Sequence, residues 1–186
     1  MRKIAVIFPG VGYTKDRPIL YYAGKLALKR GYELKFIDFA GIKWNKEKLK
    51  DQAFLLKILE ECLHIAEETL GDAGELPDDE VVFISKSIGT VVATAYAKKR
   101  SIDVCQICFS PLEPVEDYVK EESAVLFCSD EDPLADYAVL ERIAKEKRLK
   151  MHRLSGCNHS LETGDIEKDI DNLKSMMRCV DEILGG

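Results

Sequence analysis

Short segments in which almost every residue is apolar alternate along this sequence with longer segments whose apolar residues recur every three or four positions. A strand that is apolar throughout is buried on both faces, which is typical of parallel sheets covered by helices on both sides. The alternation predicts an α/β fold, a three-layer αβα sandwich around a mostly parallel sheet of about six strands. The expected strands cover residues 4–8, 33–39, 80–84, 103–109, 124–128 and 149–154.

Five helical segments are expected between and after these strands. They cover residues 17–29, 44–70, 90–97, 134–146 and 162–184. The composition, with 46% hydrophobic and 32% charged residues, is ordinary for a soluble globular chain. Because 186 residues fit one domain and no linker or repeat interrupts them, we expect a single domain over residues 1–186.

Charge and hydropathy exclude several classes of protein. The net charge of −6 argues against a nucleic-acid partner, because phosphate binding requires clustered Lys and Arg. The apolar run at residues 4–8 ends at Pro9 and Gly10, so it is too short for a signal peptide or a membrane span. We therefore expect a cytoplasmic protein that has no membrane partner.

The six cysteines are scattered, and several lie in strand-like runs. Cys105 and Cys108 form a C-x-x-C pattern, but residues three apart in a strand point to opposite faces. Reduced thiols that fill core space are the better interpretation than a metal or redox site. With no metal-ligand cluster in the sequence, we expect no metal and no cofactor.

Ser85-Lys86-Ser87-Ile88-Gly89 joins the third expected strand to a helix-like run. A serine on a tight strand-to-helix turn is the geometry of a nucleophile elbow, whose usual pattern is G-x-S-x-G. The flanking residues must be small so that strand and helix can approach. Gly89 keeps the second glycine, whereas Ser85 replaces the first. The alternative is that Ser87 is only a helix N-cap, a position that serine favours.

Ligands in open α/β sheets bind beyond the carboxyl ends of the strands, and two further strands end in candidate groups. Ser129–Pro133 follows the fifth strand and contains Asp132, whereas His159 follows the sixth strand within residues 155–160. Asp132 is the preferred acid, with Asp130 and Asp136 as alternatives. The other histidines lie inside expected elements, His64 in a helix and His152 in a strand, which indicates structural roles.

The order serine, aspartate, histidine at successive strand ends resembles the α/β hydrolases, over nearly the whole chain. It is most similar to small capless members of the dienelactone-hydrolase-like and carboxylesterase-like kind. Ser129–Pro133 resembles their G-x-x-D-P turn, and Gly156–His159 fits their G-x-x-H turn. The resemblance implies a minimal α/β-hydrolase fold that lacks the first antiparallel strands and a lid. Residues 110–122 are the only segment suited to cover the site.

That resemblance implies a serine hydrolase that cleaves an ester, thioester or similar acyl bond of a small-molecule acyl substrate, most simply a carboxylic ester. Ser87 would attack, His159 would act as base and Asp132 would orient it, through an acyl-enzyme intermediate. The backbone N–H groups of Ile88 and Val11 would form the oxyanion hole.

The loop after the first strand and Lys86 supply further candidates. Gly10, Gly12, Tyr13 and Lys86 are the substrate-binding candidates. Lys86 would either bind an anionic substrate or remain a solvated lysine at the turn. Gly10 and Gly12 are also half of a dinucleotide fingerprint. The third glycine of that fingerprint is absent, because position 15 is Lys, and an oxyanion loop explains the two glycines as well. The fold alone leaves two alternatives, a non-catalytic α/β-hydrolase-like protein or a flavodoxin-like nucleotide- or flavin-binding protein.

Overall fold

The computed structural model describes residues 2–43, 45, 51–71 and 80–186. In this part of the chain, six strands form one sheet in the order β2-β1-β3-β4-β5-β6, and all neighbouring strands are parallel. The strands are β1 (Lys3–Phe8), β2 (Glu33–Phe36), β3 (Glu80–Lys86), β4 (Cys105–Phe109), β5 (Ala124–Ser129) and β6 (Lys150–Leu154). The helices are α1 (Pro18–Lys29), α2 (Gln52–Leu70), α3 (Ile88–Arg100), α4 (Tyr137–Glu146), α5 (Ile166–Gly185) and a short 3₁₀ helix, η3 (Glu113–Asp117).

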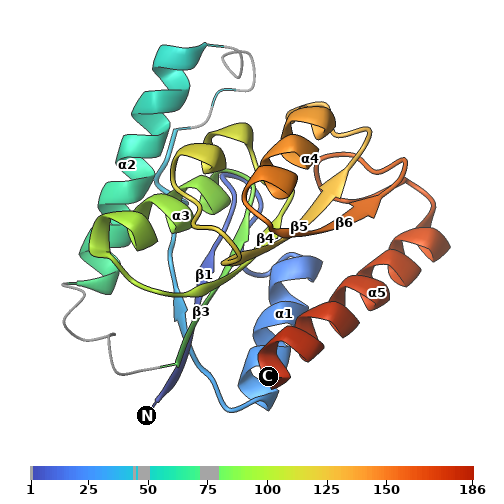
Figure 1. Ribbon diagram of the computed structural model, residues 1–186, viewed down its shortest axis with the longest axis horizontal. Coiled ribbons are helices and arrows are strands. Elements are labelled where there is room, and N and C mark those ends of the chain that lie inside the picture. Colours follow the sequence, from blue (N-terminus) through green and yellow to red (C-terminus); the bar gives the residue numbers. More distant parts are fainter. Residues whose placement is uncertain (1, 44, 46–50, 72–79) are drawn as a thin grey trace.

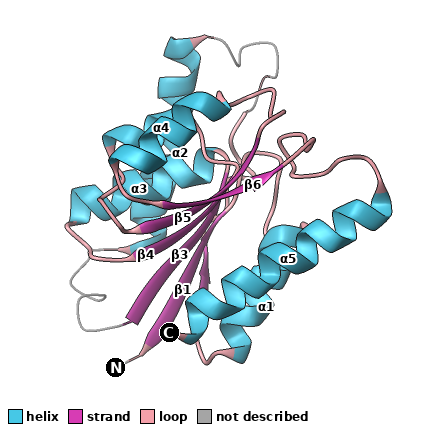
Figure 2. Cartoon of the chain, turned by 45° about the vertical axis from the view of Figure 1, so that its right-hand side comes forward, coloured by secondary structure: helices cyan, strands magenta, loops and turns pink. Residues whose placement is uncertain are grey.

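Helices cover both faces of the sheet. Figures 1 and 2 show α1 and α5 on one face and α2, α3 and α4 on the other. Successive side chains of β3 alternate between the two layers: Ile84 packs in the cluster beneath α1 and α5, whereas Phe83 packs in the cluster beneath α2 and α3. The predicted three-layer sandwich with a parallel sheet is therefore confirmed.

Several element ends differ from the predicted ones. Helix α2 begins at Gln52, after Asp51, whose carboxylate accepts hydrogen bonds from two backbone N–H groups of the first turn. The expected helix start at residue 44, with residues 46–50, lies outside the described part. Helix α4 begins at Tyr137 rather than at residue 134, and α5 begins at Ile166 rather than at residue 162. Each start follows an aspartate cap that helical periodicity alone does not reveal.

The strand order places two loops at the same crevice. Strand β2 is added to the sheet on one side of β1. Strand β3 is added on the other side of β1, and β4, β5 and β6 follow it in that direction. The order therefore reverses between the adjacent strands β1 and β3, and such a switch point is where open α/β sheets bind ligands. The loop after Phe8 and the turn at Ser87 both lie there.

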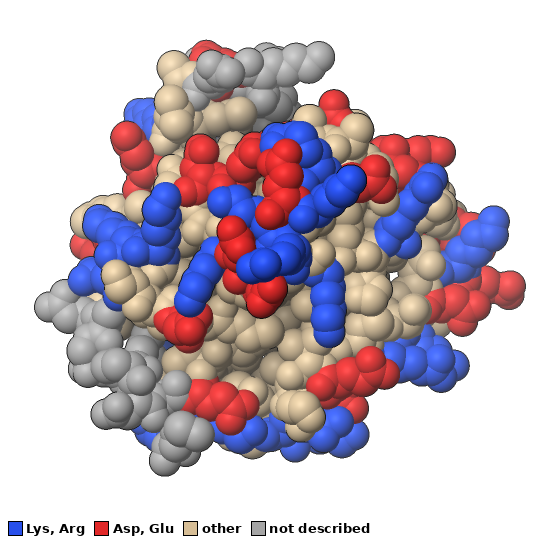
Figure 3. Space-filling view, viewed as in Figure 1, with Lys and Arg blue, Asp and Glu red and all other residues tan. Residues whose placement is uncertain are grey.

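Charge is mixed on the face shown in Figure 3, where basic and acidic side chains lie beside one another. In the described part of the chain, Arg142 pairs with Glu116 and Glu146, and Arg148 pairs with Glu121 and Glu122. Acidic side chains therefore lie between the basic ones on this face. Each helix in the described part is too short or too polar to cross a bilayer.

Candidate active site

Ser87 occupies a strained turn between β3 and α3. Its φ of 56° and ψ of −127° lie in a region that residues other than glycine rarely adopt. The Ser87 N–H is held by the carbonyl of Phe109, at 3.0 Å. Ser87 does stand at the N-cap position of α3, but its side chain makes no capping hydrogen bond. The turn instead presents the hydroxyl at the carboxyl edge of the sheet, as a nucleophile elbow does.

Packing explains the small residues on either side of Ser87. A Cβ atom on Gly89 would lie 2.3 Å from the carbonyl oxygen of Pro9 and 2.4 Å from that of Phe8, so only glycine lets α3 start over the end of β1. Ser85 is fully buried, and its hydroxyl donates to the carbonyl of Ile107, at 3.2 Å. The serine in place of the usual glycine is thus accommodated by a hydrogen bond to β4.

The structure brings Ser87, His159 and Asp132 into one chain of hydrogen bonds. The Nε2 atom of His159 lies 2.7 Å from the Oγ atom of Ser87, and its Nδ1 atom lies 2.7 Å from Oδ2 of Asp132. The other carboxylate oxygen of Asp132 accepts the N–H of Leu134, at 2.9 Å. A carboxylate at Nδ1 fixes the tautomer in which Nδ1 carries the proton, which leaves the Nε2 lone pair facing the Ser87 hydroxyl.

The two alternative acids are engaged elsewhere. Asp130 forms an ion pair with Arg153 and accepts the N–H of Gly156, at 2.9 Å, which holds the turn that precedes His159. Asp136 caps α4 by accepting the N–H groups of Ala138 and Val139, and so lies before that helix rather than within it. Asp132 is therefore the carboxylate at His159.

Lys86 is buried rather than solvated: only 1% of the residue is exposed. Its ammonium donates to the carbonyl oxygen of His159, at 2.5 Å, and lies over the ring of Tyr13. The hydroxyl of Ser110 donates to the same carbonyl, at 3.0 Å. Two donors from neighbouring strand ends thus hold the backbone of His159 in place.

Burial dominates the electrostatics of this site. It lowers the pKa of Lys86 to about 7, against the opposing charges of Asp132 and Glu162. Burial also lowers the pKa of His159 below its usual value; the hydrogen bond with Asp132 opposes this shift, and the charge of Lys86 adds to it. His159 is therefore neutral, and able to accept a proton, at neutral pH.

The loop after β1 packs directly against Ser87. Gly10 and Tyr13 pair through two backbone hydrogen bonds of 3.1 and 3.2 Å, and Gly12 has a φ of +83°. A Cβ atom on Gly10 would lie 3.2 Å from that of Ser87. Within the described residues, the N–H groups of Val11 and Ile88 make no hydrogen bond, so both donors are free.

An apolar pocket of about 450 Å³ opens beside Ser87. The segment after β4 lines it through η3, in the region where the sequence predicted a partial cover. A second wall, formed by α2, was not predicted, because its leucines are indistinguishable from core residues in a helical pattern. The lining includes Leu55, Leu56 and Leu59 of α2, Ile88 and Val91 of α3, and Leu134.

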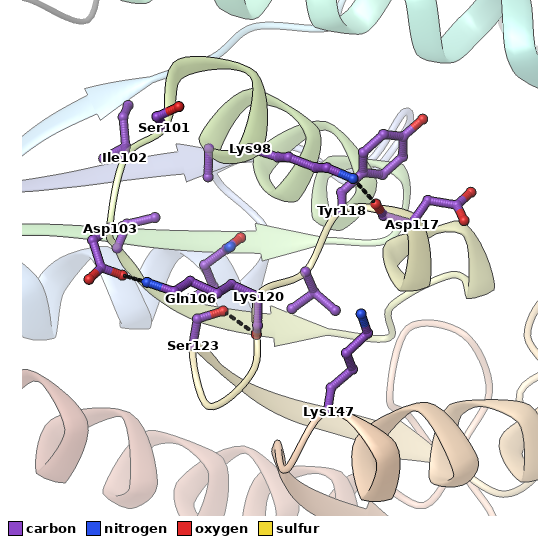
Figure 4. A pocket seen from close by; sticks show the side chains of 13 residues that line it. Lys98, Ser101, Ile102, Asp103, Gln106, Asp117, Tyr118, Lys120, Ser123 and Lys147 are labelled. Atoms are coloured by element: carbon purple, nitrogen blue, oxygen red, sulfur yellow. Dashed lines mark hydrogen bonds and ion pairs between the residues drawn. The ribbon is translucent and has the colours of Figure 1, made fainter.

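A second hollow, of about 480 Å³, lies near the opposite end of β4 (Figure 4). It is lined by lysines, but Lys98 donates to the carbonyl of Asp117 and Lys120 pairs with Asp103. Neither Ser87 nor His159 lines it. Because Ser87 lines the pocket of about 450 Å³ and does not line this hollow, the candidate site is the pocket at the carboxyl edge.

The remaining predicted features take no part in the hydrogen-bonded chain of Ser87, His159 and Asp132. All six cysteines are free, and the described residues contain no cluster of three or more groups suited to hold a metal. His64 faces Glu68 on the surface of α2, and His152 stacks on Phe127. Tyr13 packs beneath the His159 loop, with its hydroxyl accepting the N–H of Ile19.

No protein-family model matches the sequence, and no curated protein resembles it in sequence. Solved structures do resemble it. A protein of Xanthomonas campestris pv. campestris, named as a hydrolase of the α/β superfamily, is 16% identical over 98% of both chains, with a TM-score of 0.67. A lidless α/β serine hydrolase from Xanthomonas campestris is 14% identical over 98% of this chain and 83% of its own, with a TM-score of 0.62. Est1E from Butyrivibrio proteoclasticus is 14% identical over 98% and 87%, with a TM-score of 0.68. The chain thus has the α/β-hydrolase fold, in a small form.

Proposed function

We propose that this protein is a serine hydrolase that cleaves an ester, thioester or similar acyl bond of a small substrate. The observation that carries the proposal is the continuous hydrogen-bonded chain from Ser87 through His159 to Asp132, at 2.7 Å for each contact. Ser87, at one end of this chain, lies on a strained turn and lines the apolar pocket. A protein that only bound a ligand in this crevice would have no need for that proton path.

The reaction follows from the properties of the three groups. A serine hydroxyl is a weak nucleophile until a base takes its proton. His159 accepts the Ser87 proton at Nε2 while Oγ forms a bond to the acyl carbon, and Asp132 stabilises the resulting imidazolium. His159 then returns the proton to the leaving alcohol or thiol as its bond to the acyl carbon breaks. Water repeats the cycle on the acyl-enzyme, and no metal or cofactor enters the mechanism.

Negative charge on the substrate oxygen is stabilised by the two free backbone donors. We assign the N–H of Ile88 and the N–H of Val11 to this oxyanion hole. Close packing supports both donors. Gly89 allows α3, which begins with Ile88, to start beside β1, and Gly10, next to Val11, lies against Ser87. Removal of one such donor typically lowers the rate by about 100- to 1000-fold.

A fluorophosphonate probe, which reacts with activated serines, tests the proposal. We expect the native protein to be labelled and the Ser87→Ala variant to remain unlabelled. Asp132→Asn should lower kcat/KM for p-nitrophenyl acetate by about 1000-fold or more, because the neutral amide no longer fixes the tautomer.

Asp136→Asn is the matched control for Asp132→Asn, because asparagine caps a helix as well as aspartate does. It should keep nearly full activity, and so should Asp130→Asn. Equal labelling of wild type and Ser87→Ala would exclude Ser87 as nucleophile. If Asp130→Asn or Asp136→Asn lost more activity than Asp132→Asn, that other aspartate would be the acid that acts with His159.

A further inference from the structure

Helix α2 carries more apolar surface than the sheet requires. Its sheet-facing stripe, which includes Ile58 and Cys62, is buried in the core. Leu55, Leu56 and Leu59 lie beside that stripe, and Leu56 is 60% exposed. A leucine that contributes little to the core and faces a cavity marks a surface adapted to an apolar ligand.

The opposite walls of the cavity are apolar as well. Ile88 and Val91 come from the first turns of α3, against which α2 packs. Leu112 lies at the start of η3, and Leu134, 39% exposed, follows β5. Four separate parts of the chain thus bring apolar side chains to a pocket of about 450 Å³ that begins at the candidate nucleophile.

The position of the pocket indicates which part of a substrate occupies it. Ser87 lines this pocket, whereas His159 does not. The leaving group must lie at His159, because Nε2 gives it a proton. The group that stays bonded to Ser87 is the acyl group, and it therefore extends into the apolar pocket.

The charges at the pocket select among acyl groups. Its charged lining residues in the described part are Glu113 and Asp117, both acidic. Glu113 accepts the N–H of Asp136, at 2.6 Å, which holds its carboxylate beside the segment that carries Leu134. A second carboxylate at the far end of an acyl chain would meet like charge without a basic partner, so a neutral chain is favoured.

We propose, on the basis of the hydrolase function above, that the preferred substrates carry a neutral, apolar acyl chain of about six to ten carbons. At about 30 Å³ for a group the size of water, a volume of about 450 Å³ corresponds to roughly 15 such groups. The carbonyl and the open side at Leu56 take part of that space. Acetyl groups would leave the pocket nearly empty, and much longer chains would extend beyond Leu56 into solvent.

The test compares p-nitrophenyl esters from acetate to dodecanoate. Each fully buried methylene contributes about 0.8 kcal/mol, or about fourfold. Octanoate has six more methylenes than acetate. If each is about half buried in the pocket, kcat/KM for octanoate should exceed that for acetate by about 60-fold. The half-ester of octanedioic acid, which adds a carboxylate at the far end, should react at least about tenfold more slowly than octanoate.

Leu56→Glu should lower the octanoate-to-acetate ratio at least about tenfold, and Leu134→Glu, on another wall, should do the same independently. Leu28→Glu is the matched control, because Leu28 is also half-exposed on a helix but lies on α1 outside the pocket. A flat chain-length series from an enzyme whose Ser87 is labelled would overturn the acyl-chain inference alone. Failure of both labelling and hydrolysis would instead reject the proposed function.

Discussion

Lys86 is a charged group in the interior, directly before the proposed nucleophile. Its ammonium reaches the carbonyl of His159 rather than solvent, and the Ser110 hydroxyl reaches the same atom. Both side chains therefore position His159, but only Lys86 also places a charge near the imidazole. The two contributions can be separated by experiment.

Lys86→Met should move the acid limb of the pH profile of kcat/KM to higher pH. The charge of Lys86 adds to burial in lowering the pKa of His159, so its removal raises that pKa. His159 must be neutral to accept the Ser87 proton, and protonation would then inactivate the enzyme at a higher pH. The profile should be measured with p-nitrophenyl octanoate from pH 5 to pH 8.

Ser110→Ala is the control, because it removes a donor to the same carbonyl without removing a charge. It should lower kcat without moving the acid limb. Equal shifts in both variants would show that backbone position, and not charge, controls the protonation of His159.

At this scale the sequence predicted which residues meet but not how they are held. Strand ends on one edge of a parallel sheet converge, so Ser87, Asp132 and His159 could be predicted to lie together from the strand assignments alone. The burial of Lys86 could not, because a lysine at a turn is usually solvated. It depends on the loop that carries His159 closing over the α1 and α5 side of the sheet, which is a tertiary property.

At the scale of elements, the loop from Gly10 to Tyr13 controls the second proposed oxyanion donor. Gly12 has a φ of +83°, and a Cβ atom there would meet no neighbour within 4 Å. Gly12→Ala therefore changes backbone preference without steric conflict. It should cost about 1–2 kcal/mol of stability and lower kcat about 10- to 100-fold, because the N–H of Val11 shifts away from the oxyanion.

Gly31→Ala provides a matched comparison for that loop. Gly31, after α1, has a φ of +85° and similarly open surroundings. Its variant should lose comparable stability in urea unfolding while keeping full kcat. Parallel loss of activity in both variants would mean that the effect is on folding and not on the proposed oxyanion hole.

Most strands and helices could be predicted from the sequence. A continuous apolar run reflects a strand that is buried on both faces, and an apolar stripe at helical spacing reflects a helix that is buried on one face. The starts of α2, α4 and α5 were not, since a side-chain cap at Asp51, Asp136 or Asp165 decides them. The pocket wall from α2 was missed for a related reason. Leu55 and Leu59 continue the apolar stripe of the core, and periodicity cannot separate a residue that packs on the sheet from one that lines a cavity.

For the whole molecule, strand order alone does not separate the candidate functions. The order β2-β1-β3-β4-β5 is also that of flavodoxin-like folds, whose ligands bind at the same switch point. What differs is the strained Ser87 turn and the groups at the ends of β5 and β6. The fold could therefore be predicted from alternation, whereas the function depends on side chains placed at three separate strand ends.

The buried lysine and the buried thiols make opposite contributions to stability as pH rises. Burial lowers the pKa of Lys86 to about 7, so between pH 7 and its ordinary value of about 10.4 the unfolded chain binds more protons, and stability rises with pH. Burial raises the pKa of Cys62 and of Cys108 to about 12, so the unfolded chain loses these protons first, and stability falls as pH rises through about 8.5. In the wild type, the contribution of Lys86 offsets part of the loss from the thiols.

In the Lys86→Met variant, the buried thiols should lower the stability with rising pH without the offset from Lys86. Its free energy of unfolding in urea should fall relative to that of the wild type by about 1.5 kcal/mol between pH 7 and pH 8.5, because the variant lacks the proton release that favours the folded wild type. Lys168→Met, at a position on α5 whose side chain is 71% exposed, should keep a constant difference from the wild type over this range. A constant difference for Lys86→Met as well would mean that Lys86 keeps its proton in the folded protein at pH 8.5. The hydrogen bond from the ammonium to the His159 carbonyl would then outweigh the effect of burial on the pKa of Lys86.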